Sequence, residues 1–104
     1  MTVFPKSTER VSAKSVKQLT IIIVSYNTAP MTLKAIEALD LHNRSVDYDC
    51  IVIDNASTDG SVEKISEAFP MVRVISLREN VGFACANNLA ASYCTTPYLL
   101  LLNP

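Results

Sequence analysis

Residues 51–61 read IVIDNASTDGS, and this stretch decides the fold class. A run of β-branched apolar residues stops at the carboxylate of Asp54, and a polar turn then leads into a helical pattern. In an open α/β sheet, ligands bind at the carboxyl ends of the strands. A charge at the end of an otherwise apolar strand therefore indicates a binding site at that edge of the sheet.

Three further apolar runs open onto polar side chains in the same way. All of them are far shorter than the ~20 residues that a membrane-spanning helix needs. With the first stretch, they predict strands over residues 19–25, 49–54, 72–77 and 98–102. The polar residues that follow the other three strands are Ser25, Tyr26 and Asn27, then Arg78, Glu79 and Asn80, and finally Asn103.

Helical patterns lie between the predicted strands, with apolar residues recurring at helical spacing. Thr28 is expected to cap a first helix that has Pro30 at its first position, a favoured place for proline, and that runs to about residue 41. Thr58 or Asp59 is expected to cap the second helix, which Pro70 ends. Asn80 is expected to cap the third helix, which runs to about Cys94.

Strand and helix alternate strictly, at intervals of about 25 residues, a length that suits right-handed crossovers between parallel strands. Near-continuous apolar strands indicate that both faces of the sheet are covered. The sequence therefore predicts an α/β fold with three layers, α/β/α, and a mostly parallel sheet of about four strands in the order βαβαβαβ.

Composition and charge divide the chain into two regions. Of the 104 residues, 49% are hydrophobic and 18% are charged, which excludes an intrinsically disordered protein. Residues 1–18 carry four basic residues against one acidic residue, and we expect them to form a flexible leader. Residues 19–104 carry five basic residues against nine acidic ones. We expect this acidic body not to bind nucleic acid, because phosphate affinity comes from clustered Lys and Arg.

The three cysteines, Cys50, Cys85 and Cys94, are odd in number and have no C-x-x-C spacing. We interpret them as small buried hydrophobic residues in a reducing compartment rather than as disulfide partners or zinc ligands. The basic leader lacks the apolar core of a signal peptide. A cytoplasmic location is expected, with a peripheral position at the inner face of the membrane as an alternative.

The turns at the carboxyl ends of the predicted strands contain too little glycine to form a loop whose backbone N–H groups bind a phosphate. Gly60 and Gly82 are the two glycines of the chain, which excludes a P-loop and the dinucleotide-binding glycine motif. A nucleotide would then be read through side chains. Tyr26 can lie against a base, and Asp54 can accept a hydrogen bond from the ring N–H of uracil or thymine or from a ribose hydroxyl. Asn80 and the start of the third helix can face a phosphate.

Purely structural roles compete with these ligand contacts. Asp54 could cap its local turn, Asp59 could serve as a helix cap, and Tyr26 could pack against its neighbours. Asn87 and Asn88 lie inside the third helical pattern, where asparagine is a poor helix former. We expect at least one of these two asparagines to face the polar edge or a neighbouring loop.

Four segments of the chain form a recognisable set: VSYN at 24–27, VIDNASTDGS at 52–61, NVGFA at 80–84 followed by Asn87-Asn88, and LLNP at 101–104. Together they resemble the amino-terminal half of the family 2 glycosyltransferases, which have the GT-A nucleotide-diphospho-sugar fold. The resemblance covers residues 19–104 and is closest to rhamnosyltransferase-like members. The order and spacing of the segments make it specific.

This resemblance implies a Rossmann-like, nucleotide-sugar-binding subdomain over residues 19–104. It implies that Ser25, Tyr26 and Asn27 border the nucleoside, and that Asp54 pairs with the pyrimidine of a UDP- or dTDP-sugar. The other residues that it places in the nucleotide and sugar pocket are Ser57, Asn80, Gly82, Phe83, Asn87 and Asn88.

The reaction that the resemblance implies is hexosyl transfer, with inversion, to a hydroxyl of a saccharide or lipid-linked acceptor in cell-surface polysaccharide synthesis. A divalent cation, Mg²⁺ or Mn²⁺, would stabilise the departing diphosphate. A carboxylate would take the proton of the acceptor hydroxyl.

Two departures from the family pattern stand out. Cys85, Ala86 and Ala90 occupy positions where relatives often have glycine, which would narrow that part of the site. In the family, an acidic metal-binding motif, often Asn-Pro-Asp, follows the fourth strand, whereas this chain ends on Asn103-Pro104. No metal site is therefore expected to be complete, and the catalytic residues are expected beyond Pro104, in a truncated fragment that is inactive alone.

The alternative function is a non-catalytic α/β interaction module, in which the same sheet would bind a partner protein. A sugar nucleotidyltransferase is disfavoured, because such enzymes use a glycine-rich basic loop after the first strand. An exposed edge strand would also allow homodimers to form by strand pairing.

Overall fold

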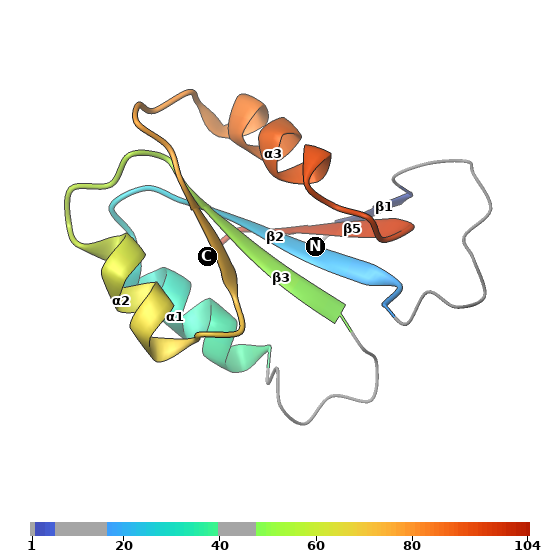
Figure 1. The fold of residues 1–104 in the computed structure, drawn as a ribbon, viewed down its shortest axis with the longest axis horizontal. Coiled ribbons are helices and arrows are strands. Elements are labelled where there is room, and N and C mark those ends of the chain that lie inside the picture. Colours follow the sequence, from blue (N-terminus) through green and yellow to red (C-terminus); the bar gives the residue numbers. More distant parts are fainter. Residues whose placement is uncertain (1, 6–16, 40–47) are drawn as a thin grey trace.

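The computed structural model describes residues 2–5, 17–39 and 48–104 (Figure 1). Residues 40–47, which include the expected end of the first helix near residue 41, lie outside the described residues. Along the chain the elements are β1 (Thr2–Pro5), β2 (Leu19–Ser25), α1 (Ala29–Ala38), β3 (Tyr48–Asp54), α2 (Ser61–Ala68), β4 (Arg73–Ser76), α3 (Phe83–Ser92) and β5 (Tyr98–Leu102).

The sheet has the order β1-β5-β2-β3-β4. Strands β5, β2, β3 and β4 run parallel to one another, and β1 is antiparallel to β5. Helices α1 and α2 lie on one side of the sheet, and α3 lies on the other (Figure 1). The predicted three-layer α/β fold with a mostly parallel sheet is confirmed.

Strand β1 corrects the expectation of a flexible leader, as far as residues 2–5 are concerned. Val3 pairs with Leu100, and Pro5 pairs with Tyr98. The short strand covers the edge of β5, whose backbone groups would otherwise lack a neighbouring strand on that side. Proline is tolerated there because an edge strand leaves one side without ladder hydrogen bonds. Residues 6–16 of the expected leader lie outside the described residues.

The helix caps differ from the predicted ones. Gly60, in the left-handed conformation with φ 78°, precedes α2 in place of Thr58 or Asp59. Gly82, with φ 84°, precedes α3 in place of Asn80. Glycine adopts positive φ without steric cost, so both turns tighten at the residue type that does so most readily. Thr28 does precede α1, with proline in the first turn, but its side chain makes no capping hydrogen bond.

Two hydrophobic clusters hold the layers together, because successive residues of a strand face opposite sides of the sheet. Ile21, Ile23 and Val52 face α1 and α2, together with buried Ile36 and Ile65 from those helices. On the other side, α3 packs with two buried alanines on the sheet, which allows a close approach. This second cluster contains Ile22, Ile51, Ile53, Ala86, Ala90, Cys94 and Leu99.

All four parallel strands end at one edge of the sheet, which we call the rim. Ser25 pairs with Asp54, and Asp54 pairs with Ser76, at the ends of β2, β3 and β4. Ile23 pairs with Leu102, so Asn103 follows directly at the end of β5. The register therefore brings the loops after all four strands to the same side of the molecule.

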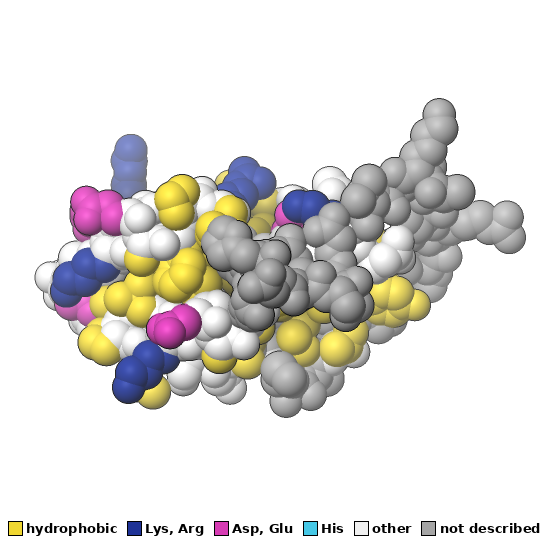
Figure 2. All heavy atoms as spheres, turned by 90° about the horizontal axis from the view of Figure 1, so that it is seen from below, with side chains coloured by type: hydrophobic (Ala, Val, Ile, Leu, Met, Phe, Trp, Pro, Cys, Tyr) yellow, Lys and Arg dark blue, Asp and Glu magenta, His cyan; other side chains and the backbone are white. Residues whose placement is uncertain are grey.

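The surface is mixed in character. On the face shown in Figure 2, basic, acidic and hydrophobic side chains are interspersed. Within the described residues, no helix is both long enough and apolar enough to span a bilayer.

The three thiols are predicted to differ sharply in reactivity. Cys50 and Cys94 are buried, whereas Cys85 is exposed. Burial, helped by the neighbouring charge of Asp49, raises the pKa of the Cys50 thiol to about 12. Because the thiolate is the reactive form, we expect Ellman's reagent at about pH 8 to modify one thiol of the native chain rapidly. A Cys85→Ser variant should lose this fast phase, and a second fast thiol in that variant would contradict the prediction.

Candidate functional site

Hydroxyl groups of Ser25, Thr28 and Thr32 hold the turn after β2 against the start of α1. The Ser25 side chain is fully buried, with its Oγ 3.0 Å from Thr32 Oγ1 and 3.2 Å from Thr28 Oγ1. Asn27 has a positive φ of 50°, which turns the chain sharply towards α1. Tyr26 between them is 48% exposed. The anchored turn therefore presents an aromatic ring to solvent at the rim.

Asp54 forms the turn after β3. Its side chain is 1% exposed, and its two oxygens accept hydrogen bonds from Ser57, at 2.8 Å from the backbone N–H and 2.6 Å from the hydroxyl. Short acidic side chains commonly bond nearby backbone in this way. The carboxylate therefore takes the turn-forming role that the sequence left open as a structural alternative. The expected contact of Asp54 with a nucleobase stays a prediction, since each carboxylate oxygen can accept more than one hydrogen bond.

Ser57 and Asn27 join the first two rim turns. The backbone N–H of Asn27 donates to Ser57 Oγ at 2.9 Å, and the backbone N–H of Thr58 donates to Asn27 Oδ1 at 2.7 Å. Since Ser57 Oγ also donates to Asp54, one chain of hydrogen bonds runs from β3 to the turn after β2. Asp54 thus positions the turn that carries Tyr26.

Asp59 ties the start of α1 to the start of α2. Its Oδ2 accepts a hydrogen bond from the backbone N–H of Ala29 at 3.3 Å, and its Oδ1 accepts one from the N–H of Ser61 at 3.0 Å and another from the Ser61 hydroxyl. The Ser61 hydroxyl is the main cause of a lowered pKa for this carboxyl, and backbone N–H groups add to it. Asp59 therefore stabilises the helix start without being the formal cap.

Asn55 is the site residue that the sequence analysis missed. It is 3% exposed, and both polar atoms of its side chain form hydrogen bonds with the backbone of the loop before α3. Its Oδ1 accepts from the Val81 N–H at 2.8 Å, and its Nδ2 donates to the Gly82 carbonyl at 3.2 Å. Its position beside Asp54 at a strand end was the available signal, but only the fold shows which loop it reaches.

The loop before α3 carries the next predicted residues. Asn80 is exposed, and its Oδ1 accepts a hydrogen bond from the Gly82 N–H at 2.8 Å, so it shapes its own turn. Phe83 is exposed at the first position of α3. Of the two helix asparagines, Asn87 is buried and donates to the Phe83 carbonyl at 3.2 Å, while Asn88 is exposed.

The geometry brings most of the predicted residues into one network. The turns after β2 and β3 are joined through Ser57, and the loop before α3 is joined to β3 through Asn55. Leu77 adds a backbone link by donating to the Asp54 carbonyl at 2.9 Å. Asn103 is exposed and lies at the same edge, directly after the end of β5.

The part of the chain that the structure describes contains no cluster of metal-binding side chains. Among these residues, no three His, Cys, Asp or Glu side chains lie together in a way that could hold one. Asp54 is occupied by Ser57, and Asp59 is occupied by helix-start groups. The described residues therefore do not fit a metal site by themselves.

Comparison with known proteins identifies the family. The model of glycosyl transferase family 2 matches residues 20–104, which includes every element of the rim. The chain belongs to glycosyl transferase family 2. The resemblance that the rim motifs indicated is thereby confirmed, as is the α/β fold of the GT-A type.

Two relatives illustrate how much of a family 2 protein this chain represents. The teichoic acid poly(glycerol phosphate) polymerase of Staphylococcus epidermidis is 33% identical over 90 residues, which are 83% of this chain and 12% of that protein. The solved mannosyltransferase PcManGT from Pyrobaculum calidifontis, in complex with GDP-Man and Mn²⁺, is similar with a TM-score of 0.62 and 25% identity. The match covers 79% of this chain and 26% of that one.

Removing the Asn55 side chain should loosen the loop before α3. In an Asn55→Ala variant of this family 2 chain, the Val81 N–H and the Gly82 carbonyl lose their partners at a partly buried position. We expect the free energy of unfolding in urea to fall by about 1–3 kcal/mol. Asn88→Ala, at an exposed asparagine of α3, is the matched control and should cost almost nothing. Equal losses in the two variants would contradict the role of Asn55.

The lowered pKa of Asp59 predicts that its contribution to the free energy of unfolding is lost at acidic pH. Because its folded-state pKa lies below the ordinary value of 3.8, the charged carboxylate stabilises the folded chain above that pH. The contribution is lost as the pH falls through the folded-state pKa. The difference in urea midpoint between the natural chain and Asp59→Asn should therefore be clear at about pH 6 and shrink towards about pH 3. A difference that grows on acidification would show that the sign is wrong.

Proposed function

We propose that the rim binds the nucleoside diphosphate of a UDP- or dTDP-sugar, in a whole protein that transfers the sugar to an acceptor hydroxyl. The observation that carries this proposal is the hydrogen-bonded network of three loops at the carboxyl ends of parallel strands, where ligands of open α/β sheets bind. Two exposed aromatic rings, Tyr26 and Phe83, belong to these loops.

Tyr26 is the residue proposed to touch the base. Its ring is exposed on a turn that is held rigid by buried Ser25 and by Asn27, so little conformational entropy is lost when a base stacks on it. Asp54 supports this contact through Ser57, whose hydroxyl bonds both Asp54 and the backbone of Asn27. It is a positioning residue in this proposal.

The start of α3 is proposed to face the diphosphate. Helix N-termini favour anions, because their backbone N–H groups and the helix dipole point outward. The first turn of α3 contains no acidic residue that would repel phosphate. Gly82 opens the helix with a positive φ and no side chain, while Asn80, Asn87 and Asn88 line the approach in the proposal.

The reaction proposed for the whole protein is attack of an acceptor hydroxyl on the anomeric carbon, with inversion and departure of the nucleoside diphosphate. A carboxylate outside the described residues would take the hydroxyl proton. The divalent cation, Mg²⁺ or Mn²⁺, is assigned to the whole protein as well, since the described residues do not fit a metal site. The chain alone is proposed to bind donor without turning it over.

The biological setting is also a proposal. We propose a hexosyl transfer to a saccharide or lipid-linked acceptor in cell-surface polysaccharide synthesis. The similarity to a mannosyltransferase supports the hexosyl group, and the similarity to a teichoic acid poly(glycerol phosphate) polymerase supports a role in polymer synthesis. Three cysteines that are all free suit a reducing compartment, which supports a cytoplasmic place or a peripheral one at the inner face of the membrane. A homodimer could form by strand pairing at the β4 edge.

Titration calorimetry of the 104-residue chain tests the donor proposal. We expect weak, saturable heat with UDP or dTDP in the presence of Mn²⁺, and weaker binding of GDP. Tyr26→Ala should abolish the heat, because stacking on a base contributes about 1–3 kcal/mol. Tyr98→Ala is a matched control, since Tyr98 is 47% exposed at the other end of the sheet.

Two outcomes would overturn this assignment. Equal heats for UDP and GDP would contradict the pyrimidine preference. GDP is a suitable comparison ligand, because the similar mannosyltransferase was solved in complex with GDP-Man. Binding that survives in Tyr26→Ala, or is lost equally in Tyr98→Ala, would place the nucleotide elsewhere. A folded chain that responds to no nucleotide would favour the interaction module.

A further inference from the structure

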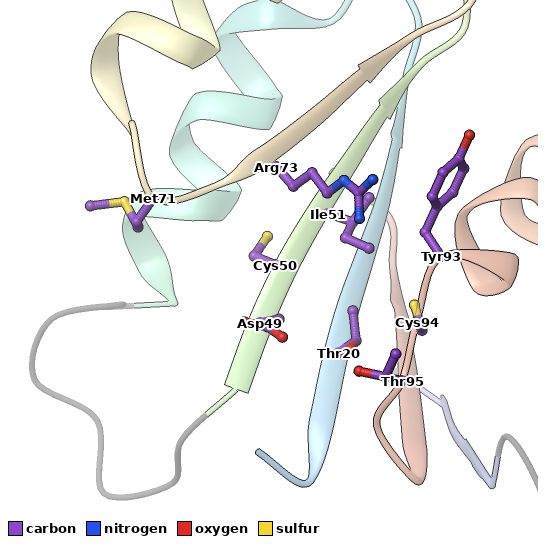
Figure 3. Close-up of a pocket in the computed structure, with 9 residues that line it drawn as sticks. All are labelled: Thr20, Asp49, Cys50, Ile51, Met71, Arg73, Tyr93, Cys94 and Thr95. Atoms are coloured by element: carbon purple, nitrogen blue, oxygen red, sulfur yellow. The ribbon is translucent and has the colours of Figure 1, made fainter. Parts of the chain in front are cut away.

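A cavity of about 300 Å³ lies at the end of the sheet opposite to the rim (Figure 3). Its walls come from the amino-terminal parts of β2, β3 and β4 and from the carboxyl end of α3. This volume is at the lower end of the range for small-molecule pockets. None of the predicted nucleotide-binding residues lines it. The proposed donor site therefore does not account for the cavity.

One cation of this cavity has no carboxylate partner in the part of the chain that the structure describes. The Arg73 guanidinium lies over the Tyr93 ring, with Cζ 4.7 Å from the ring centroid. Among the described residues, no acidic side chain forms an ion pair with it. In Figure 3 the guanidinium reaches from β4 across Ile51 towards Tyr93. The ring holds the guanidinium in place and leaves its N–H donors for another group.

The acidic side chain of the cavity is already neutralised. Asp49 accepts a hydrogen bond from Lys17 Nζ at 2.6 Å, and this contact is an ion pair. Of the two charged side chains that line the cavity, Asp49 is paired with Lys17, which leaves the Arg73 guanidinium to attract an anionic ligand.

The remaining walls are apolar or carry hydroxyl groups. Ile51 lies beside the Arg73 guanidinium, whereas Met71 lies on the side of the cavity far from Tyr93, with its side chain directed away from Arg73 (Figure 3). Thr95 is exposed at the mouth, while the Thr20 hydroxyl is 2.8 Å from that of Thr96. The two lining thiols offer no covalent chemistry. Burial keeps Cys50 protonated, and Cys94 Sγ donates to the Ala90 carbonyl at 3.3 Å.

We propose that this cavity binds a small organic oxyanion, with a carboxylate or phosphate group on the Arg73 guanidinium and an apolar body against Ile51. The planar guanidinium presents paired N–H donors that match both kinds of oxyanion. The site is separate from the proposed donor site, so either can fail without the other.

Amide NMR titrations of the 104-residue chain with benzoate, phenyl phosphate and benzamide test this site. The three probes share one ring, so the first two separate carboxylate from phosphate and the third lacks the charge. We expect saturable shifts at Tyr93, Thr95 and Arg73 with at least one of the anions. Arg73→Gln should weaken binding about tenfold or more, since a charge-assisted contact is lost. Arg78→Gln, at an exposed arginine outside the cavity, should leave it unchanged.

The comparison of probes on the natural chain keeps the test decisive even if Arg73→Gln folds poorly. Benzamide that shifts the same amides as strongly as the anions would show an apolar groove without anion recognition, and would overturn the proposal. So would shifts that stay linear with concentration for both anions, or that persist unchanged in Arg73→Gln. Loss of UDP binding has no bearing on this result, because the two sites share no residue.

Discussion

The in-register parallel pairing of β2 with β3 is the constraint on which the rest of the structure depends. The ladder runs from Leu19 beside Tyr48 to Ser25 beside Asp54, so both strands end at the same level. The Asn55 N–H continues it by donating to the Ser25 carbonyl at 2.8 Å. A slip by one residue would turn every side chain of β3 to the other face of the sheet. The rim turns could then no longer meet.

The polar residues of the rim act chiefly on one another. Asp54 is held by Ser57, Ser57 is held by Asn27, and Asn55 holds the loop before α3. Buried polar groups of this kind stabilise a structure only when all partners are present, because an orphaned group in a low-dielectric interior is costly. A rigid polar frame with exposed aromatic rings is well suited to hold a flat ligand in one orientation.

Strand β3 carries a carboxylate at each end, and the two have different surroundings. Asp54 at the rim is buried and bonded by its own turn, whereas Asp49 at the other end is half-exposed and paired with Lys17. The sheet thus separates two chemically distinct regions. The rim offers amides, hydroxyls and a helix start, and the far cavity offers a guanidinium held over an aromatic ring.

Strand and helix positions could be read from the sequence, because the apolar runs and their helical intervals reflect burial on the two faces of a sheet. The predicted strand over residues 19–25 matches β2, and the one over 98–102 matches β5. Local turn chemistry was harder to assign. Positive φ at Gly60 and Gly82 moved both helix starts away from the predicted side-chain caps. Pairing of residues 2–5 with β5 is non-local and left no signal in the basic leader.

By itself the sequence determined the layered α/β architecture, the common edge at which the strands end, and the family to which its motifs belong. These properties follow from patterns of neighbouring residues. Only the tertiary structure decided what each polar side chain does there. Asp54 turns inward to Ser57, and Asn55 reaches a loop 26 residues away at Val81. Hydrogen-bond partners across loops depend on how the strands are registered, which no local pattern encodes.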